Sequence, residues 1–562
     1  MKSVLEMVKG RIISLINSAA ESAKNTGTLN YEGLPEFVLE VPREKEHGDF
    51  ATNIAMLLAR QAKMSPRQVA ETLKNNINTQ GSWVARIEIA GPGFINFYLN
   101  NNWVHEVLLQ VEEQGEQYGN TDTGQGKMVQ VEFVSANPTG LLHMGNARGA
   151  ALGDTMANLL IAAGFAVTRE FYINDTGNQI ENFGKSLEAR YLQQMGQDVV
   201  FPEDGYHGQD IIDTVKRITA LDPGNKYFDM VPDRRKEIFV KYALEEKLQA
   251  IKNTLHQFGV EYDIWFSEQS LHESGAVNAV LDELRDKGYI YEHEGALWLK
   301  TTAFGEEKDE VVVRSNGTPT YFAADIAYHK NKFDRGFKWV INIWGADHHG
   351  HVARLKGAMK ALGYDPDSLD IVIMQLVRLF KGGEIIRMSK RSGEFVTLED
   401  LVAEVGKDAA RYFFVMRSPD SHLDFDMDLA KSESTENPIY YIQYAYARIC
   451  SIFRQLEERG GAVPLAGSCN LALLKEPAEL ELMRKLVDFP TEISEAAVNL
   501  EPHRLARYAH ELAGLFHSFY NSHRVMIDDR ELQNARIVLV KSVQTVVKRA
   551  LELLGLTAPE SM

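Results

Sequence analysis

Cysteine is nearly absent from this 562-residue sequence, which contains only Cys450 and Cys469. Two cysteines cannot form a zinc ribbon or a disulfide framework, so the sequence predicts a protein of a reducing compartment, the cytoplasm. Long apolar runs are also absent, because no stretch approaches the roughly 18 consecutive apolar residues that span a bilayer. Near the N-terminus, Glu6, Lys9 and Arg11 interrupt apolar residues at helical spacing. This pattern indicates an amphipathic helix and not a signal peptide.

Positive charge is in short supply: 60 Lys and Arg stand against 78 Asp and Glu, for a net charge of −18. A chain of this charge repels a phosphate backbone at long range, which argues against indiscriminate nucleic-acid binding. The acidity is uneven, because residues 501–562 carry eight Lys and Arg against seven Asp and Glu. A specific RNA partner held by local basic patches therefore remains open.

The length predicts three or four domains, because a single hydrophobic core does not grow to this size. Residues 1–120 combine helical patterns with short alternating strands, which predicts an α+β domain. The helical patterns cover residues 1–24 and 50–75, and the strands cover residues 83–89 and 94–99. A segment rich in Gly, Thr and Asp at residues 119–126 then indicates a linker.

A second domain is predicted over residues 121–380. It opens with a strand at 128–133, a helix at 147–163 and a strand at 165–171, which is the order of a doubly wound nucleotide-binding fold. A polar, largely helical stretch at about 178–285 indicates an insertion. Further strand patterns occupy residues 296–300, 309–314, 338–344 and 369–376, with a helix at about 350–362.

The rest of the chain is predicted to be helical. A short region at 381–430 contains helices from about 398 to 418. From residue 436 to 555 strand patterns disappear, which predicts an all-α bundle over residues 431–562.

A glycine-bearing segment, Ser135–Asn146 (SANPTGLLHMGN), joins the first strand and helix of the second domain. We call it the first motif. A helix N-terminus presents free N–H groups and a partial positive charge, which suit a phosphate. Gly140 and Gly145 would let a ligand approach the backbone, and His143 could donate a hydrogen bond to departing pyrophosphate. The alternative is an ordinary strand–turn–helix with an incidental histidine.

A short basic segment, Arg387–Arg391 (RMSKR), forms the second motif. A mobile loop bearing a cation could close over a triphosphate and offset negative charge in the transition state. Gly382, Gly383 and Gly393 supply plausible hinges. The alternative is a solvated basic loop.

Together, in this order, the two motifs resemble the nucleotide-binding signatures of class I aminoacyl-tRNA synthetases, and their surroundings resemble arginyl-tRNA synthetases. The resemblance implies a multidomain α/β protein with a Rossmann-like catalytic domain, an N-terminal α+β domain and a C-terminal all-α anticodon-binding bundle. It implies catalytic roles for His143, Asn146, Arg387 and Lys390. Asn146 departs from the family's second histidine, and Arg387 replaces its first lysine. The implied ATP-binding residues are Ala136, Asn137, Pro138, Thr139, Gly140, Leu141, Leu142, His143, Met144, Gly145, Asn146, Met388, Ser389 and Lys390.

Carboxylates mark the predicted amino-acid pocket, because a planar guanidinium pairs with them through two hydrogen bonds. Glu132 ends the strand before the first motif, and Tyr321 and Asp325 share a face at i, i+4 spacing. The resemblance implies that these three residues bind the guanidinium, that Ser135 and Asn137 hold the α-amino and carboxylate ends, and that His348 lies beside them. Taken singly, Tyr321 could instead fill a core and Asp325 could cap a helix.

Metal binding is expected only through ATP with Mg²⁺. Adjacent histidines such as His348 and His349 rarely converge on one metal, and no cysteine cluster supports them, so zinc is not expected.

Further segments resemble parts of the family that contact tRNA. Residues 171–179 and 408–411 resemble two more signatures, and Arg411 in the second is expected to have a structural role, on a helix where it pairs or packs between domains. Residues 46–51 and 91–96 resemble the domain that contacts the tRNA elbow. In the bundle, aromatic side chains could stack on unpaired bases and arginines could bind phosphates, although tyrosines of a bundle more often fill its core. The implied tRNA-binding residues are Tyr440, Tyr444, Arg448, Arg504 and Met562.

The resemblance implies ATP-dependent activation of L-arginine and its transfer to tRNA(Arg) by a monomer. One alternative is another class I synthetase. A cysteinyl enzyme would need zinc ligands, and a glutamyl or glutaminyl pocket would need basic groups in place of Glu132 and Asp325. The other alternative is a non-catalytic RNA-binding paralogue, for which Asn146 gives the only support.

Overall fold

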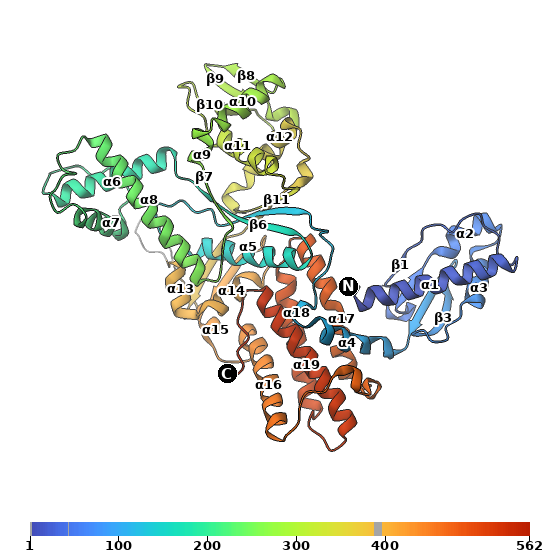
Figure 1. The fold of residues 1–562 in the computed structure, drawn as a ribbon. Coiled ribbons are helices and arrows are strands. Elements are labelled where there is room, and N and C mark those ends of the chain that lie inside the picture. Colours follow the sequence, from blue (N-terminus) through green and yellow to red (C-terminus); the bar gives the residue numbers. More distant parts are fainter. Residues whose placement is uncertain (1–2, 43, 387–395) are drawn as a thin grey trace.

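The computed structural model describes residues 3–42, 44–386 and 396–562 of the chain (Figure 1). Arg387, Met388, Ser389 and Lys390 of the second motif lie outside this part. Four regions follow one another along the chain: an N-terminal α+β domain, a domain built on a parallel sheet, a small mixed region and a helical bundle. The predicted fold class is confirmed.

The N-terminal domain packs three helices on an antiparallel sheet of strand order β1-β2-β4-β3. The helices are α1 (Val4–Asn25), α2 (Ile54–Ala62) and α3 (Pro66–Asn76), and the strands are β1 (Leu39–Glu40), β2 (Phe50–Thr52), β3 (Val84–Ala90) and β4 (Phe94–Leu99). The single helical stretch expected at 50–75 is wrong. Its first three residues form β2, and Lys63, at φ 52°, ends α2 in a left-handed cap before Ser65 caps α3. Helix α4 (Glu106–Gln114) then leads to the second domain.

Five parallel strands form the centre of the second domain, in the order β12-β11-β5-β6-β7. They are β5 (Met128–Glu132), β6 (Ala166–Ile173), β7 (Ile264–Ser267), β11 (Trp339–Gly345) and β12 (Leu369–Met374). The order reverses between β5 and β11, and such a switch point leaves a crevice at the carboxyl ends of the strands. Helix α5 (Met144–Ala162) lies close against the sheet at Gly153, where a Cβ atom would come within 2.1 Å of the Phe133 ring.

Two excursions leave this sheet (Figure 1). The first contains α6 (Gly177–Gln194), α7 (Gln209–Ala220) and α8 (Pro232–Gln257), which share their own small core. The chain returns to β11 through α11 (Tyr321–Asp334), and α12 (Val352–Leu362) connects β11 to β12, while the second excursion itself contains α9 (Gln269–Glu273), α10 (Ala276–Asp286) and an antiparallel sheet. Its strands are β8 (Ile290–His293), β9 (Ala296–Leu299) and β10 (Glu310–Val313). The expectation of a helical insertion at 178–285 missed β7, a four-residue edge strand too short to show a period.

The small mixed region pairs three strands in the order β14-β13-β15. They are β13 (Val377–Lys381), β14 (Glu384–Ile386) and β15 (Leu423–Asp426), and the helices beside them are α13 (Leu398–Val405), α14 (Lys407–Val415) and α15 (Met427–Lys431). The sequence predicted only the helices here.

The bundle consists of α16 (Pro438–Glu458), α17 (Pro477–Val498), α18 (His503–Ser522) and α19 (Arg530–Leu553). Over the described ranges, every helix is too short or too polar to cross a membrane.

A buried arginine joins three of these regions. Arg411, on α14, is fully buried and donates from Nη2 to Asp154 of α5 at 2.5 Å. Its Nη1 and Nε donate to the carbonyl oxygens of Phe258, just past α8, at 3.1 Å and of Leu554, just past α19, at 3.2 Å. The structural role expected for Arg411 between domains is therefore confirmed.

Replacing Arg411 by Met should destabilise the unit that contains α5, α14 and α19 by about 3–5 kcal/mol, because Asp154 would lose its close buried partner. Urea unfolding followed by circular dichroism measures this change. The matched control is Arg507→Met, which removes an exposed arginine whose nearest carboxylate oxygen, on Glu511, is 3.9 Å away. Equal unfolding midpoints for the two variants would contradict the stabilising role of Arg411 between these regions.

Candidate active site

The first motif begins with a strained turn at the switch point of the sheet. Val134 and Ser135, directly after β5, have φ angles of 69° and 40°. Residues with side chains rarely adopt this region, and such strain often marks functional sites. Because of this turn, Ser135 Oγ donates to Glu132 Oε1 at 2.9 Å. Ser135 Oγ also accepts a hydrogen bond from the Tyr172 N–H of β6 at 3.1 Å.

His143 is the N-cap of α5. Its Nδ1 accepts from the Gly145 N–H at 3.1 Å, and its own N–H donates to Asn146 Oδ1 at 3.1 Å. A neutral imidazole whose Nδ1 accepts carries its proton on Nε2, the tautomer that can donate from that atom to a phosphate oxygen. Asn146 completes a capping box, so its amide oxygen is used to start the helix.

The two motifs are flanked by a direct backbone contact. The Leu398 N–H donates to the Leu142 carbonyl at 2.9 Å, and Thr397 forms an antiparallel bridge with His143. In the sequence, the second motif follows directly after Ile386, the last residue of β14, and ends six residues before Thr397. Residues about 255 positions apart in the sequence are thus brought to the N-terminus of α5.

Tyr321 lies at the first position of α11, beside the start of α6. A Cβ atom on Gly177 would lie 3.2 Å from Tyr321 Oη, and the Tyr321 side chain is otherwise exposed. Asn137 Nδ2 donates to Gln179 Oε1 of α6 at 2.5 Å. Gln179 was not assigned to the site from sequence, although it belongs to the signature at 171–179.

Asp325 has a histidine partner, His351. His351 Nε2 lies 2.9 Å from Asp325 Oδ2, and both side chains are partly buried. His348, the residue predicted from sequence, is 59% exposed and has Asp347 as its nearest carboxylate, at 3.7 Å. The three histidines lie within one turn, and sequence alone does not show which of them faces α11.

Glu132 carries a partner that sequence reasoning missed. Lys332 of α11 is fully buried, and its Nζ lies 2.5 Å from Glu132 Oε2 and 2.8 Å from Asn342 Oδ1 of β11. Asn342 in turn contacts His329 Nε2 at 2.6 Å. Burial and the neighbouring Lys332 ammonium hold the pKa of His329 well below its usual range, so this histidine is neutral. The only signal in the sequence was a lysine at an apolar position of a helix.

Within the described ranges, the His, Cys, Asp and Glu side chains form no group of three or more that could hold a metal ion.

In the bundle, the predicted tRNA-binding side chains fall into two sets. Tyr440 and Tyr444 stack with ring centroids 6.1 Å apart, and the Arg448 guanidinium lies 4.5 Å from the Tyr444 ring centroid. Arg504 is instead surrounded by carboxylates of the bundle, with Glu492 at 3.1 Å, and so is already paired. Met562 is exposed at the C-terminus. The structure therefore brings Tyr440, Tyr444 and Arg448 together and leaves Arg504 apart from them.

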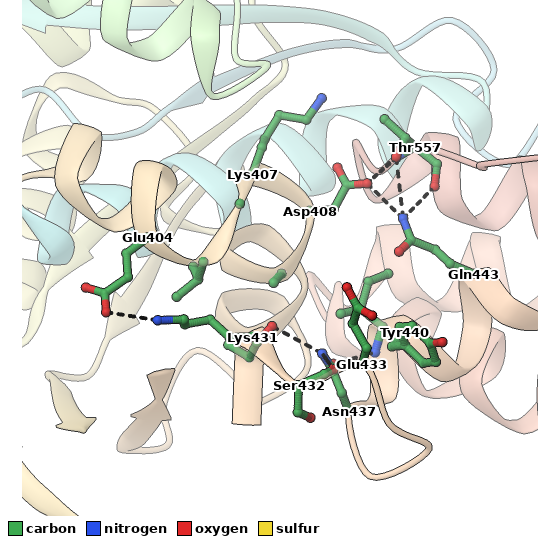
Figure 2. Close-up of a pocket in the computed structure, with 15 residues that line it drawn as sticks. Glu404, Lys407, Asp408, Lys431, Ser432, Glu433, Asn437, Tyr440, Gln443 and Thr557 are labelled. Atoms are coloured by element: carbon green, nitrogen blue, oxygen red, sulfur yellow. Dashed lines mark hydrogen bonds and ion pairs between the residues drawn. The ribbon is translucent and has the colours of Figure 1, made fainter. Parts of the chain in front are cut away.

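A hollow of about 640 Å³ lies between the mixed region and the bundle, and Tyr440 lines it (Figure 2). At one side, Asp408 Oδ2 accepts from Gln443 Nε2 of α16 at 2.8 Å and from the Thr557 N–H at 3.0 Å. On the other side, Lys431 reaches Glu404 at 3.3 Å. Asp408 opens the signature at 408–411, so this signature holds the C-terminal segment with Asp408 and again with Arg411.

Comparison with protein families covers nearly the whole chain. The family model for the arginyl tRNA synthetase N terminal domain matches residues 10–99. The model for the catalytic domain of class I (R) tRNA synthetases matches residues 106–417, and the DALR anticodon binding domain matches residues 442–562.

Similar proteins cover the same length. The arginine–tRNA ligases of Desulforamulus reducens and Heliobacterium modesticaldum are 62% and 61% identical to this chain, over 100% and 99% of it and 100% of each relative. A Campylobacter jejuni structure described as an arginyl-tRNA synthetase has a TM-score of 0.75 at 35% identity, covering 83% of this chain and 100% of that one. The Thermus thermophilus arginyl-tRNA synthetase shares the fold, with a TM-score of 0.71 at 23% identity over 98% and 99% of the two chains. The chain belongs to the arginyl-tRNA synthetase family.

Proposed function

We propose that this chain ligates L-arginine to tRNA(Arg) in two steps that consume ATP. In the first step, an arginine carboxylate oxygen attacks the α-phosphorus of ATP, which forms arginyl-adenylate and releases pyrophosphate. In the second step, the 2′-hydroxyl of the terminal ribose of tRNA attacks the carbonyl carbon of the adenylate, which gives arginyl-tRNA and AMP. Neither step requires a covalent enzyme intermediate, so positioning and electrostatic stabilisation carry the catalysis.

The observation that carries this proposal is the contact, at the N-terminus of α5, between the first motif and the segment that follows the second motif in the sequence. The contact from Leu398 to Leu142 places the flank of the second motif beside His143. A triphosphate bound there would meet the positive end of the helix and the His143 Nε2–H. Lys390 and Arg387 would supply positive charge as pyrophosphate departs, and residues 136–146 with Met388, Ser389 and Lys390 would form the ATP site. Asn146 would act by fixing the start of the helix, through its contact with His143.

Arginine would lie between α11 and the carboxyl end of β5. Asp325 is partly exposed and offers carboxylate oxygens to the guanidinium, and Tyr321 lies one helical turn before it. Glu132 would lie on the opposite side, with Ser135 and Asn137 near the α-amino and carboxylate groups. His351 contacts Asp325 and would orient its carboxylate, and His348 would lie beside these ligands.

Magnesium would enter with ATP. The described residues offer no cluster of three or more metal-ligating side chains, which suits an ion held mostly by phosphates and water. It would neutralise charge on the phosphates when bound.

The tRNA would contact both ends of the chain. We assign the elbow contact to residues 1–120, the acceptor-stem contact to the region 381–430 and the anticodon contact to residues 431–562. In the bundle, the stacked Tyr440 and Tyr444 and the adjacent Arg448 suit unpaired bases and phosphate. Met562 would lie near them, and Arg504 would contribute through its carboxylate cluster to the bundle itself. We further propose a monomer that works in the cytoplasm.

The test is ATP–pyrophosphate exchange with each of the twenty amino acids, with and without total tRNA. Exchange with arginine and no other amino acid is the expected result, and we expect it to depend on tRNA. Exchange with another amino acid would overturn the pocket assignment. A complete lack of exchange would favour the non-catalytic RNA-binding paralogue.

Asp325→Asn should raise the KM for arginine by about 10- to 100-fold, because a charged hydrogen bond to the guanidinium is lost. The KM for ATP should stay within about twofold, since Asp325 lies on α11 and the proposed ATP site lies at the N-terminus of α5. The control is Asp334→Asn, on the same helix, which removes a carboxylate paired with Lys330 at 2.7 Å on the surface. Equal increases in the two KM values would count against Asp325 as an arginine ligand.

A further inference from the structure

The Lys332 ammonium connects three elements that meet under the proposed arginine pocket. It lies on α11, contacts Glu132 of β5 at 2.5 Å and contacts Asn342 of β11 at 2.8 Å. These two strands lie on either side of the switch point. Lys332 therefore lies below the crevice, at the inner side of the helix that presents Tyr321 and Asp325.

Both carboxylate oxygens of Glu132 are occupied. Lys332 holds Oε2, and Ser135 Oγ donates to Oε1. A buried carboxylate without a cation costs several kcal/mol, so the ammonium balances the charge of Glu132 and fixes the orientation of its side chain. Glu132 thus enters the pocket as half of an ion pair and not as a free anion.

The same network reaches the second proposed arginine ligand. His329 Nδ1 donates to the Asp325 carbonyl at 2.7 Å, so its Nε2 accepts from the Asn342 amide at 2.6 Å. The chain of contacts runs from Glu132 through Lys332, Asn342 and His329 to the backbone of Asp325. Because His329 is neutral, Lys332 is the cation in this chain that balances Glu132.

We propose that Lys332 is a positioning residue for arginine recognition. It orients Glu132 and balances its charge, and it holds α11 against the sheet in the position from which Asp325 can contact the guanidinium. This inference rests on the proposed function, and it adds a residue that never touches the substrate. A lysine that only stabilised the fold would affect arginine and ATP alike when removed. A positioning lysine acts on the arginine site alone.

The test is Lys332→Met, which keeps the apolar stem and removes the charge. We expect the KM for arginine in exchange to rise at least about tenfold, with the KM for ATP within about twofold of the wild type. The matched control is Lys247→Met. Lys247 is also a buried lysine with a carboxylate partner, Asp210, at 2.7 Å, but it lies on α8 in the separate helical excursion. Its loss should lower the melting temperature and leave both KM values unchanged.

A second variant guards against misfolding of Lys332→Met. The double variant Glu132→Gln with Lys332→Met leaves no buried charge unpaired, so it should recover most of the lost melting temperature. It should still bind arginine at least about tenfold more weakly than the wild type, because it lacks both the Glu132 carboxylate and the ion pair that orients it. Lys332→Met should also weaken arginine binding less in the Glu132→Gln background than in the wild type, because Lys332 acts through Glu132. Lys332→Arg keeps the positive charge, so it should bind arginine more tightly than Lys332→Met does.

Two results would overturn the inference. One is an arginine KM within about twofold of the wild type in the double variant, and the other is an equal rise in the arginine and ATP KM values. Neither result concerns the proposed function, which depends on arginine-specific exchange by the wild-type chain. Lack of arginine exchange by the wild type would refute the proposed function instead.

Discussion

Helix α11 and its C-cap residue Arg335 are held against the parallel sheet by one buried and one partly buried ion pair, and the geometry of the proposed pocket depends on them. Lys332 pairs with Glu132 of β5, and Arg335 pairs with Glu170 of β6 at 2.5 and 2.9 Å. The Tyr328 hydroxyl adds a third contact, to Glu170 at 2.6 Å. Breaking a buried pair costs about 3–5 kcal/mol, so a shift of α11 along the sheet would be strongly unfavourable. The helix is therefore a rigid platform for the side chains that it presents at its N-terminal end.

Helix α5 has the corresponding role on the nucleotide side. His143 and Asn146 define its first turn, and Arg148, fully buried, donates to the carbonyl oxygens of Gln375 at 2.8 Å and Ser418 at 2.9 Å. Burial lowers the pKa of Arg148 to about 10, and the guanidinium still stays charged at neutral pH. Further along α5, Asp154 accepts a hydrogen bond from Arg411, so the helix that begins at the proposed ATP site is fixed to the mixed region and to the end of the bundle.

The sequence was sufficient for the parts of the molecule that leave a local signal. The strands β5, β6, β11 and β12 have apolar runs, and the two motifs have fixed residues at fixed spacing. Strand β7 and the sheet β14-β13-β15 were not predicted, because their pairing is non-local and each strand is short. The contacts of Lys332 and His351 were not predicted for another reason. A buried charge becomes recognisable only when its partner, here Glu132 or Asp325, is known to lie beside it.

The central claim is that carboxylates of this crevice select a guanidinium. The most direct measurement is calorimetric titration with L-arginine and with L-citrulline, which has the same shape but is neutral at the end of its side chain, with tRNA present. The account predicts that arginine binds at least about 100-fold more tightly, because citrulline cannot form the charged pair of hydrogen bonds with Asp325. Equal affinities for the two amino acids would contradict it.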